Sequence, residues 1–476
     1  LCKRVRREEP VKAVFSSFRA FFRHLKMRIG LVNLREDKGC PPIGLVYLAT
    51  SLKKELPEIL VKIIDINYDN IFKEVLKYDL IGISAMTIDY GKAIRLAEYI
   101  KSISKIPIII GGVHISTLPE SFKKCFNGYI LGEGEYAFSQ LIKDILKNKE
   151  ENILDGYGLY NKSLDDLPLP NWNFVNKNYF RYDALTTWGE FGREGAILTA
   201  RGCPYKCVFC STSAFWQDIR FYSAEYVINM IKDLVYNYGI THIQIWDDLF
   251  VINKKRLYQI RDLLHKENLI KKVKFNCQPR ADLINNEICQ LLKDMNVKIA
   301  LFGFESGNDR MLRFLKKSSI SVETNKKAIQ LCNKYNIKVQ GSIIFGSPTE
   351  TLSEMQDTLD FIDYAYKNKV NRLWSFVMTP FPATEMWQYA LLKNKVSDDM
   401  DWEKLNHQGI NNPLLLDSNI NKEDFKRIFL ESRKKLNKFK WRKIWSFFKN
   451  NPFMTCFYIL IKPYKYLYIL ISKRIF

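Results

Sequence analysis

The chain has 476 residues, which is long enough for two domains. Its content of 47% hydrophobic and 14% aromatic residues supports hydrophobic cores and excludes wholesale disorder. Its formal net charge is +22, but residues 1–28 carry +7 and residues 421–476 carry +12, so the body is nearly neutral and no nucleic-acid partner is expected. Seven of the ten cysteines are scattered without regular spacing, and no secretory signal is evident. This excludes a disulfide framework and predicts a protein of the reducing cytoplasm.

Residues 1–26 form a basic N-terminal extension ahead of the first strand-like run. Phe15, Phe18, Phe22 and Leu25 follow one another at roughly helical spacing, which predicts an amphipathic helix. Because Met27 directly precedes the first strand, an upstream extension outside the fold is an equal alternative.

Residues 27–149 alternate strand-sized apolar runs with amphipathic helical stretches. The strand-like runs are MRIGLVNL, LVKIIDI, DLIGISAM, IPIIIGG and GYILGEGE. Such alternation predicts βα units that form a doubly wound, Rossmann-like α/β sheet, which binds ligands at the carboxyl ends of its strands. Small residues and glycines gather at those ends, and the candidate binding residues are Pro42, Gly44, Ser84, Met86, Thr87, Gly111, Gly112, Thr117, Gly132 and Glu133.

Each glycine in these turns has a structural alternative, because αβ and βα turns require glycine without any ligand. No G-x-G-x-x-G or G-x-x-x-x-G-K-[ST] motif is present, so a nucleotide site of either familiar kind is not predicted. His114 is expected to be a turn histidine with satisfied hydrogen bonds and no catalytic role.

The stretches GGVHISTLPE and LGEGEYAFSQLI resemble the cobalamin-binding domain that precedes the barrel in some radical S-adenosylmethionine (SAM) enzymes. The resemblance implies a corrinoid above the strand ends, contacted by the residues named above. The chain departs from one cobalamin pattern, because none of its five histidines lies in a D-x-H-x-x-G motif. A histidine as the lower axial ligand is therefore not expected.

A connector at residues 150–194, with DDLPLPNWNF at its centre, leads into a second α/β array at residues 195–395. About six βα units follow, which predicts a partial (βα)6 TIM barrel with its site at the carboxyl ends of the strands.

Three cysteines follow the first strand of this array as C-x-x-x-C-x-x-C: Cys203, Cys207 and Cys210. A zinc or four-cysteine iron site completed by Cys277 is one alternative. A [4Fe–4S] cluster held by three thiolates leaves one iron open to an outside ligand. The spacing, with Phe209 just before the last cysteine, resembles the radical SAM signature, and the resemblance implies that the amino and carboxylate groups of SAM fill the open position.

Further matches fall at later strand ends. The resemblance places Asp247 and Asp248 at the ammonium of SAM, Arg280 at its carboxylate and Glu305 at its ribose hydroxyls. In the alternative readings, the two aspartates cap the following helix and Glu305 pairs with Arg280. FGSPTE resembles the family's G-x-P-x-E turn, and Pro382-Ala383-Thr384 stands where the family has Pro-Gly-Thr.

The two resemblances together imply a cobalamin-dependent (class B) radical SAM methyltransferase. In this family, cobalamin takes a methyl group from one SAM, and a second SAM yields the 5′-deoxyadenosyl radical that activates an inert carbon of a small molecule. A flavodoxin or ferredoxin is the expected electron donor. The alternatives are a cobalamin-dependent oxidation or rearrangement, an RNA methylthiotransferase, and a non-catalytic corrinoid or iron–sulfur sensor.

The region 396–476 is basic and aromatic, and its apolar runs are broken by Lys462, Pro463 and Lys465, so none is long enough to span a bilayer. It predicts either a helical layer packed on the body or a segment that lies on the inner membrane surface. The second alternative suggests a lipid-like substrate.

Overall fold

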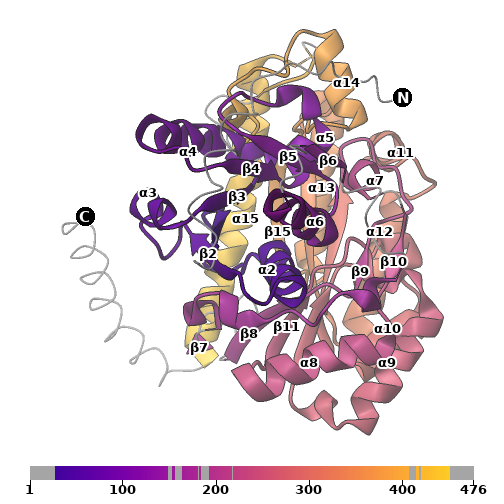
Figure 1. The fold of residues 1–476 in the computed structure, drawn as a ribbon. Coiled ribbons are helices and arrows are strands. Elements are labelled where there is room, and N and C mark those ends of the chain that lie inside the picture. The colour runs from indigo at the N-terminus through magenta and orange to yellow at the C-terminus, as the bar shows by residue number, and fades with distance from the viewer. Residues whose placement is uncertain are drawn as a thin grey trace.

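The computed structural model describes residues 27–147, 153–155, 163–180, 182–183, 192–216, 218–406, 414–417 and 420–450. The predicted N-terminal extension, residues 1–26, lies outside the described residues, as do residues 451–476. The described parts form two α/β units whose elements follow one another in the predicted order (Figure 1).

The first unit is a six-stranded, all-parallel sheet with the order β2-β1-β3-β4-β5-β6. Its strands are β1 Arg28–Asn33, β2 Leu60–Asp65, β3 Leu80–Ser84, β4 Ile108–Gly111, β5 Gly128–Leu131 and β6 Ile153–Asp155. Its helices are α2 Ile43–Glu55, α3 Ile71–Glu74, α4 Tyr90–Ile103, α5 Val113–Thr117 and α6 Gly134–Leu146, with 3₁₀ turns at Val75–Lys77, Thr87–Asp89 and Pro119–Ser121. The doubly wound sheet is confirmed, and β6 adds a strand within the predicted connector.

The second unit is a seven-stranded sheet with the order β15-β14-β13-β12-β11-β8-β7. Its strands are β7 Tyr182–Asp183, β8 Gly192–Ile197, β11 His242–Ile245, β12 Lys274–Cys277, β13 Val297–Glu305, β14 Lys338–Phe345 and β15 Arg372–Val377. Its helices are α7 Thr212–Phe215, α8 Ala224–Tyr238, α9 Lys254–Lys266, α10 Asn286–Asp294, α11 Asp309–Lys316, α12 Val322–Lys334, α13 Leu352–Lys367 and α14 Glu385–Leu392. Six strands, β8 and β11 to β15, run parallel, and the antiparallel β7 closes one edge. The partial (βα)6 barrel is confirmed.

Local sequence signals fix the helix ends of the barrel. Ser223 caps α8 by accepting a hydrogen bond from the Tyr226 amide, and Gly239 ends the helix in the left-handed region at φ 66°. Thr351 and Glu354 form a reciprocal capping box at the start of α13. In the strands between these helices, buried apolar residues alternate with partly exposed ones, as in β12 and β15.

The segment after the barrel packs back on both units. Trp402 lies in a 3₁₀ turn, Trp402–Lys404, and is in ring contact with Tyr90 and His114 of the first unit. The helix α15, Lys422–Asn450, lies against α13 and β15 and buries Phe425 and Phe429. The packed-layer alternative therefore holds for the first half of α15, shown in yellow in Figure 1. In the described residues, no helix has the length and hydropathy that a transmembrane span requires.

Candidate active site

Contacts between the two units bring the carboxyl ends of the two sheets, where both sets of binding residues were predicted, close together. Glu133, after β5 of the first sheet, contacts Arg201, which follows the barrel's first strand. Helix α5 of the first unit lies in contact with α7, the short helix after the three cysteines. Parallel sheets bind ligands at this edge, so a ligand held by one unit lies next to a ligand held by the other.

The three cysteines lie on a loop, residues 202–219, whose ends pair as two short strands, β9 Ala200–Arg201 and β10 Arg220–Phe221. Cys203, Cys207 and Cys210 are half-buried and none is in a disulfide. In the part of the chain that the structure describes, no group of three His, Cys, Asp or Glu side chains is arranged to hold a single metal ion. Cys277 lies in the barrel core and is 1% exposed, so the zinc alternative with Cys277 as the fourth ligand finds no support.

The surroundings of the loop suit an anionic iron–sulfur cluster. Burial raises the pKa of the Cys203 and Cys207 thiols, and for Cys207 the nearby cations Lys316 and Arg280 oppose that rise without reversing it. Arg280 places Nη1 3.7 Å from Cys207 Sγ and its guanidinium 3.8 Å from the centre of the Tyr205 ring. The three free thiols lie on one loop beside cations but are not close enough together to bind one metal ion, which suits a larger iron–sulfur cluster.

Asp247 holds the start of the cysteine loop. Its carboxylate is fully buried and accepts hydrogen bonds from the Thr199 amide (2.5 Å), the Thr199 hydroxyl (2.5 Å) and the Ala200 amide (3.1 Å). Burial raises its pKa to about 6, although the Thr199 hydrogen bonds and the Arg256 charge oppose that shift. The guanidinium of Arg256 donates to the Thr199 carbonyl at 2.5 Å, so Thr199 is held from both sides.

Asp248 holds the same loop further along. It accepts from the Gly202 amide at 3.2 Å and the Thr212 hydroxyl at 3.1 Å. Neither aspartate caps the next helix, because Asn253 is the N-cap of α9. The contact of both aspartates with the ammonium of SAM stays a prediction, and the structure adds that they fix the cysteine loop.

Arg280 and Glu305 lie at the ends of neighbouring strands but do not pair with each other. Arg280 donates to Asp282 (2.8 Å) and to Ser318 (2.5 Å). Glu305 lies 3.1 Å from Lys316 Nζ and has a left-handed backbone, φ 62°, which is strained for a residue other than glycine. Both side chains are more than nine-tenths buried. Their SAM contacts stay predictions, and the alternative ion pair between them is not formed.

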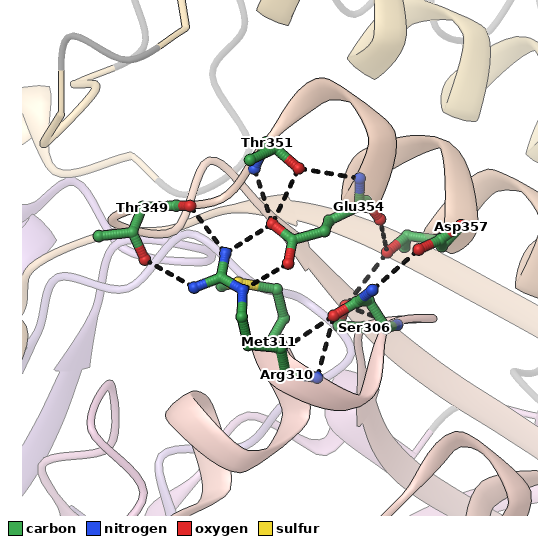
Figure 2. Close-up of polar contacts among 9 residues, drawn as sticks. Ser306, Arg310, Met311, Thr349, Thr351, Glu354 and Asp357 are labelled. Carbon is green, nitrogen blue, oxygen red and sulfur yellow. Dashed lines mark hydrogen bonds and ion pairs between the residues drawn. The ribbon is translucent and has the colours of Figure 1, made fainter.

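The loops after β13 and β14 are tied together by polar contacts (Figure 2). Arg310 donates to both carboxylate oxygens of Glu354, at 2.5 and 2.6 Å, and to the carbonyl of Thr349 at 2.8 Å. Asn308 donates to Asp357 at 2.8 Å. The loop after β13, which follows the predicted SAM residue Glu305, is therefore tied to the FGSPTE turn after β14.

Glu350, the acid of the FGSPTE turn, is buried and held by the backbone. It accepts from the Gly346 amide at 2.7 Å and the Ser347 amide at 3.0 Å. Burial raises the pKa of its carboxyl to about 8, from an ordinary 4.5. Because the folded-state pKa lies above the unfolded one, the stability that this group contributes is complete below pH 4.5 and is lost as the pH rises through 8.

As the pH rises from 5 to 8.5, the wild type should lose unfolding free energy that Glu350→Gln keeps. We therefore expect the stability difference in favour of Glu350→Gln to grow by about 1–3 kcal/mol over this range. The glutamine keeps the oxygen that accepts the two amides and has no charge to bury. Thermal unfolding of both proteins across this range measures the effect, with the exposed Glu225→Gln as the control. Parallel pH profiles for Glu350→Gln and the wild type would contradict the assignment.

The sixth strand end shows how the chain tolerates its missing glycine. Ala383 adopts φ 60°, a left-handed conformation that glycine adopts without strain. Thr384, next to it, caps α14 by accepting from the Trp387 amide at 3.0 Å. The turn therefore keeps its shape with alanine, at some cost in strain.

The predicted corrinoid residues all lie at the carboxyl edge of the first sheet. Gly112 has φ 97°, and a Cβ there would lie 2.8 Å from the Ala85 backbone, so the loops after β3 and β4 meet through glycine. Gly44 has open space where a side chain would be, and Met86 is 43% exposed. A rim of glycine backbone with open space beside it fits a flat macrocycle, and these contacts stay predictions.

Other polar side chains at the carboxyl edge of the first sheet already have hydrogen-bond or ion-pair partners within the protein. Thr87 and Ser121 contact the two ring nitrogens of His114, which is fully buried, and burial lowers its pKa to about 3. The satisfied hydrogen bonds expected of His114 are confirmed, although the residue lies in α5 and not in a turn. Thr117 donates its hydroxyl to the Val113 carbonyl, and the Glu133 carboxylate is bound by two arginines of the barrel.

The sequence did not single out four functional side chains: Arg201, Arg220, Arg256 and Lys316. Arg201 directly precedes Gly202-Cys203, and that adjacency was the only signal available. Arg220, Arg256 and Lys316 are distant in sequence from the residues that they contact, so only the fold reveals these contacts.

A cavity of about 760 Å³ opens at the opposite end of the barrel, between the connector and α8. Pro170, Asn173, Arg193 and Asn237 are among its lining residues. It lies at the amino end of β8, the end of the barrel opposite the cysteine loop, where barrels of this kind do not carry their chemistry.

Comparisons with known proteins agree with this geometry. Residues 32–142 match the B12 binding domain, and residues 197–362 match the Radical SAM superfamily. A protein of Pyrococcus horikoshii named as an uncharacterized methyltransferase is 30% identical over 389 residues, which cover 76% of this chain and 81% of the relative. The bacteriochlorophyllide d C-12(1)-methyltransferase of Chlorobaculum tepidum is 24% identical and covers 76% of each chain.

The fold also matches a solved structure. The radical SAM methyltransferase TsrM of Kitasatospora setae superposes with a TM-score of 0.65 at 18% identity, over 78% of this chain and 77% of that one. At this identity the match shows the fold alone. The two matched domains, the three free thiols and the glycine rim assign a [4Fe–4S] cluster, SAM and cobalamin as the cofactors. The chain is an enzyme that belongs to the radical SAM superfamily, within the group that carries a B12-binding domain ahead of the barrel.

Proposed function

We propose that the enzyme transfers a methyl group from SAM, by way of cobalamin, to an unactivated carbon of a small molecule. The observation that carries this proposal is the meeting of the two rims: the glycine edge of the first sheet faces the cysteine loop across the Glu133–Arg201 contact. A methyl carrier and a radical generator must act on the same substrate atom, and this arrangement puts both at one site. The relatives named above as methyltransferases support the same reaction.

When bound, the cluster with SAM supplies a 5′-deoxyadenosyl radical, and the corrinoid supplies a methyl carrier. The residues of the chain bind and position these groups. Cys203, Cys207 and Cys210 would ligate the cluster, and Arg280 and Glu305 would hold the carboxylate and ribose of SAM. The buried strand ends exclude water from the reacting carbon, which protects a reactive radical. A lipid-like substrate, the electron donor and peripheral membrane contact rest on the sequence alone and stay predictions.

Anaerobic reconstitution with iron, sulfide and hydroxocobalamin tests the proposal. We expect about four irons, one bound corrinoid and release of 5′-deoxyadenosine from SAM. Iron without bound corrinoid would remove methyl transfer by cobalamin and leave a radical SAM enzyme. Both cofactors with radical formation but no methyl transfer would assign an oxidation or a rearrangement instead.

A further inference from the structure

The two short strands that close the cysteine loop, β9 and β10, form its stem, and this stem carries two arginines that face each other. Strands β9 and β10 pair over two residues each, and Arg201 of β9 lies directly opposite Arg220 of β10. Like charges directly opposite each other destabilise a strand pair, and both side chains are at least nine-tenths buried. The stem therefore needs an anion from elsewhere in the fold.

The first unit provides that anion. Glu133 binds Arg201 Nη1 at 2.7 Å with one oxygen and Arg220 Nη2 with the other. Glu135 binds Arg201 Nη2 at 2.6 Å. Glu133 is the N-cap of α6 and Glu135 lies in its first turn, and their side chains are 9% and 8% exposed. Two glutamates and two arginines make this network neutral only when the corrinoid-binding unit is docked on the barrel.

Arg201 is also held between rings of the two units. Its guanidinium carbon lies 5.6 Å from the centre of the Tyr47 ring, in α2, and 5.5 Å from that of Trp216, in the cysteine loop. Cation–π contacts of this kind gain strength when they are shielded from water. The Arg201 side chain, two positions before Cys203, is therefore held by contacts to the first unit and to the cysteine loop.

We propose that Glu133 and Glu135 are positioning residues for the iron–sulfur cluster, although they belong to the corrinoid-binding unit. They neutralise the stem of the cysteine loop and hold it in the place where the cluster must face the corrinoid. In this proposal the Glu133 carboxylate acts on the barrel, whereas the sequence predicted that Glu133 contacts cobalamin. This inference depends on the two cofactors of the family and not on the proposed methyl transfer.

Glu133→Gln is the test, because it removes the charge and keeps the shape. We expect the iron content and the rate of 5′-deoxyadenosine release to fall about 10–100-fold in line with the loss of an outer-shell partner. The affinity for hydroxocobalamin, measured from its absorbance on titration, should stay within about twofold of the wild type, because no contact to the corrinoid is lost. The exposed Glu58→Gln is the control and should change neither quantity.

A second substitution separates positioning from general damage. In Glu133→Gln/Arg220→Gln the remaining pair, Arg201 and Glu135, is again neutral, so iron binding should recover towards the wild-type value. If Glu133→Gln does not fold, Glu133→Asp replaces it and should lower iron content with unchanged corrinoid affinity.

Three results would overturn the inference: a large loss of corrinoid affinity with an intact cluster, no change in either cofactor, or no recovery in the double variant. Failure of the proposed methyl transfer is a different result, since the iron measurement needs neither a substrate nor a corrinoid.

Discussion

Replacing Cys203, Cys207 and Cys210 together by alanine is expected to abolish cluster binding and to lower 5′-deoxyadenosine release by at least about 10³-fold. The three thiols are the free cysteines on the loop between β9 and β10. Each single substitution should be nearly as severe as the triple one, because groups that act as a unit are not additive. Iron analysis and the absorbance of the cluster measure the loss.

Two other cysteines provide the controls. Cys277→Ala tests the fourth-ligand alternative directly and is expected to keep its iron, since that thiol lies in the barrel core. Cys40→Ala, in the first unit, should also keep it. A cluster that survives the triple substitution, or is lost on Cys277→Ala with the fold intact, would refute the assignment of the three ligands.

Asp247→Ala is expected to destabilise the protein by about 3–5 kcal/mol, because it leaves two buried amides and one buried hydroxyl without their acceptor. Asp247 is the shared acceptor for two amides and one hydroxyl at the start of the cysteine loop. Cluster loading should fall with it. Asp247→Asn retains one carbonyl oxygen for the two amides, so its effect should be smaller. Denaturant unfolding under anaerobic conditions measures the free energies.

The exposed Asp398→Ala is the matched control for Asp247→Ala and should leave the unfolding free energy within about 0.5 kcal/mol of the wild type. An Asp247 that contacts SAM without supporting the loop would give a different result. Stability and iron content would then be unchanged in the alanine variant, and the affinity for SAM alone would fall.

The sequence supported prediction of the architecture because the signals for it are local. The period of apolar residues identified the five strands of the first sheet up to β5 and the six parallel strands of the barrel. The C-x-x-x-C-x-x-C spacing placed the ligands on the loop after β8. Each of these inferences needs only residues that are near one another in the chain.

The partners of the charged residues were not predictable in the same way. Asp247 and Asp248 were correctly placed at a strand end, but which donors face them depends on how the cysteine loop returns over the sheet. Glu133 was placed on the rim of the first sheet, and its partners Arg201 and Arg220 lie 68 and 87 residues away. Strand-end position indicates that a side chain is near the site, and the packing of the two units decides what it binds.

The fate of the methyl group of SAM tests the central claim most directly. Reconstituted enzyme with bound corrinoid would be supplied with SAM that carries a deuterated methyl group, a low-potential reductant and no further substrate. Mass spectrometry would then follow the label on the corrinoid, together with S-adenosylhomocysteine and 5′-deoxyadenosine. The account predicts that the label reaches the corrinoid and that 5′-deoxyadenosine release requires the three cysteines. Radical formation with a bound but unlabelled corrinoid and no S-adenosylhomocysteine would contradict it.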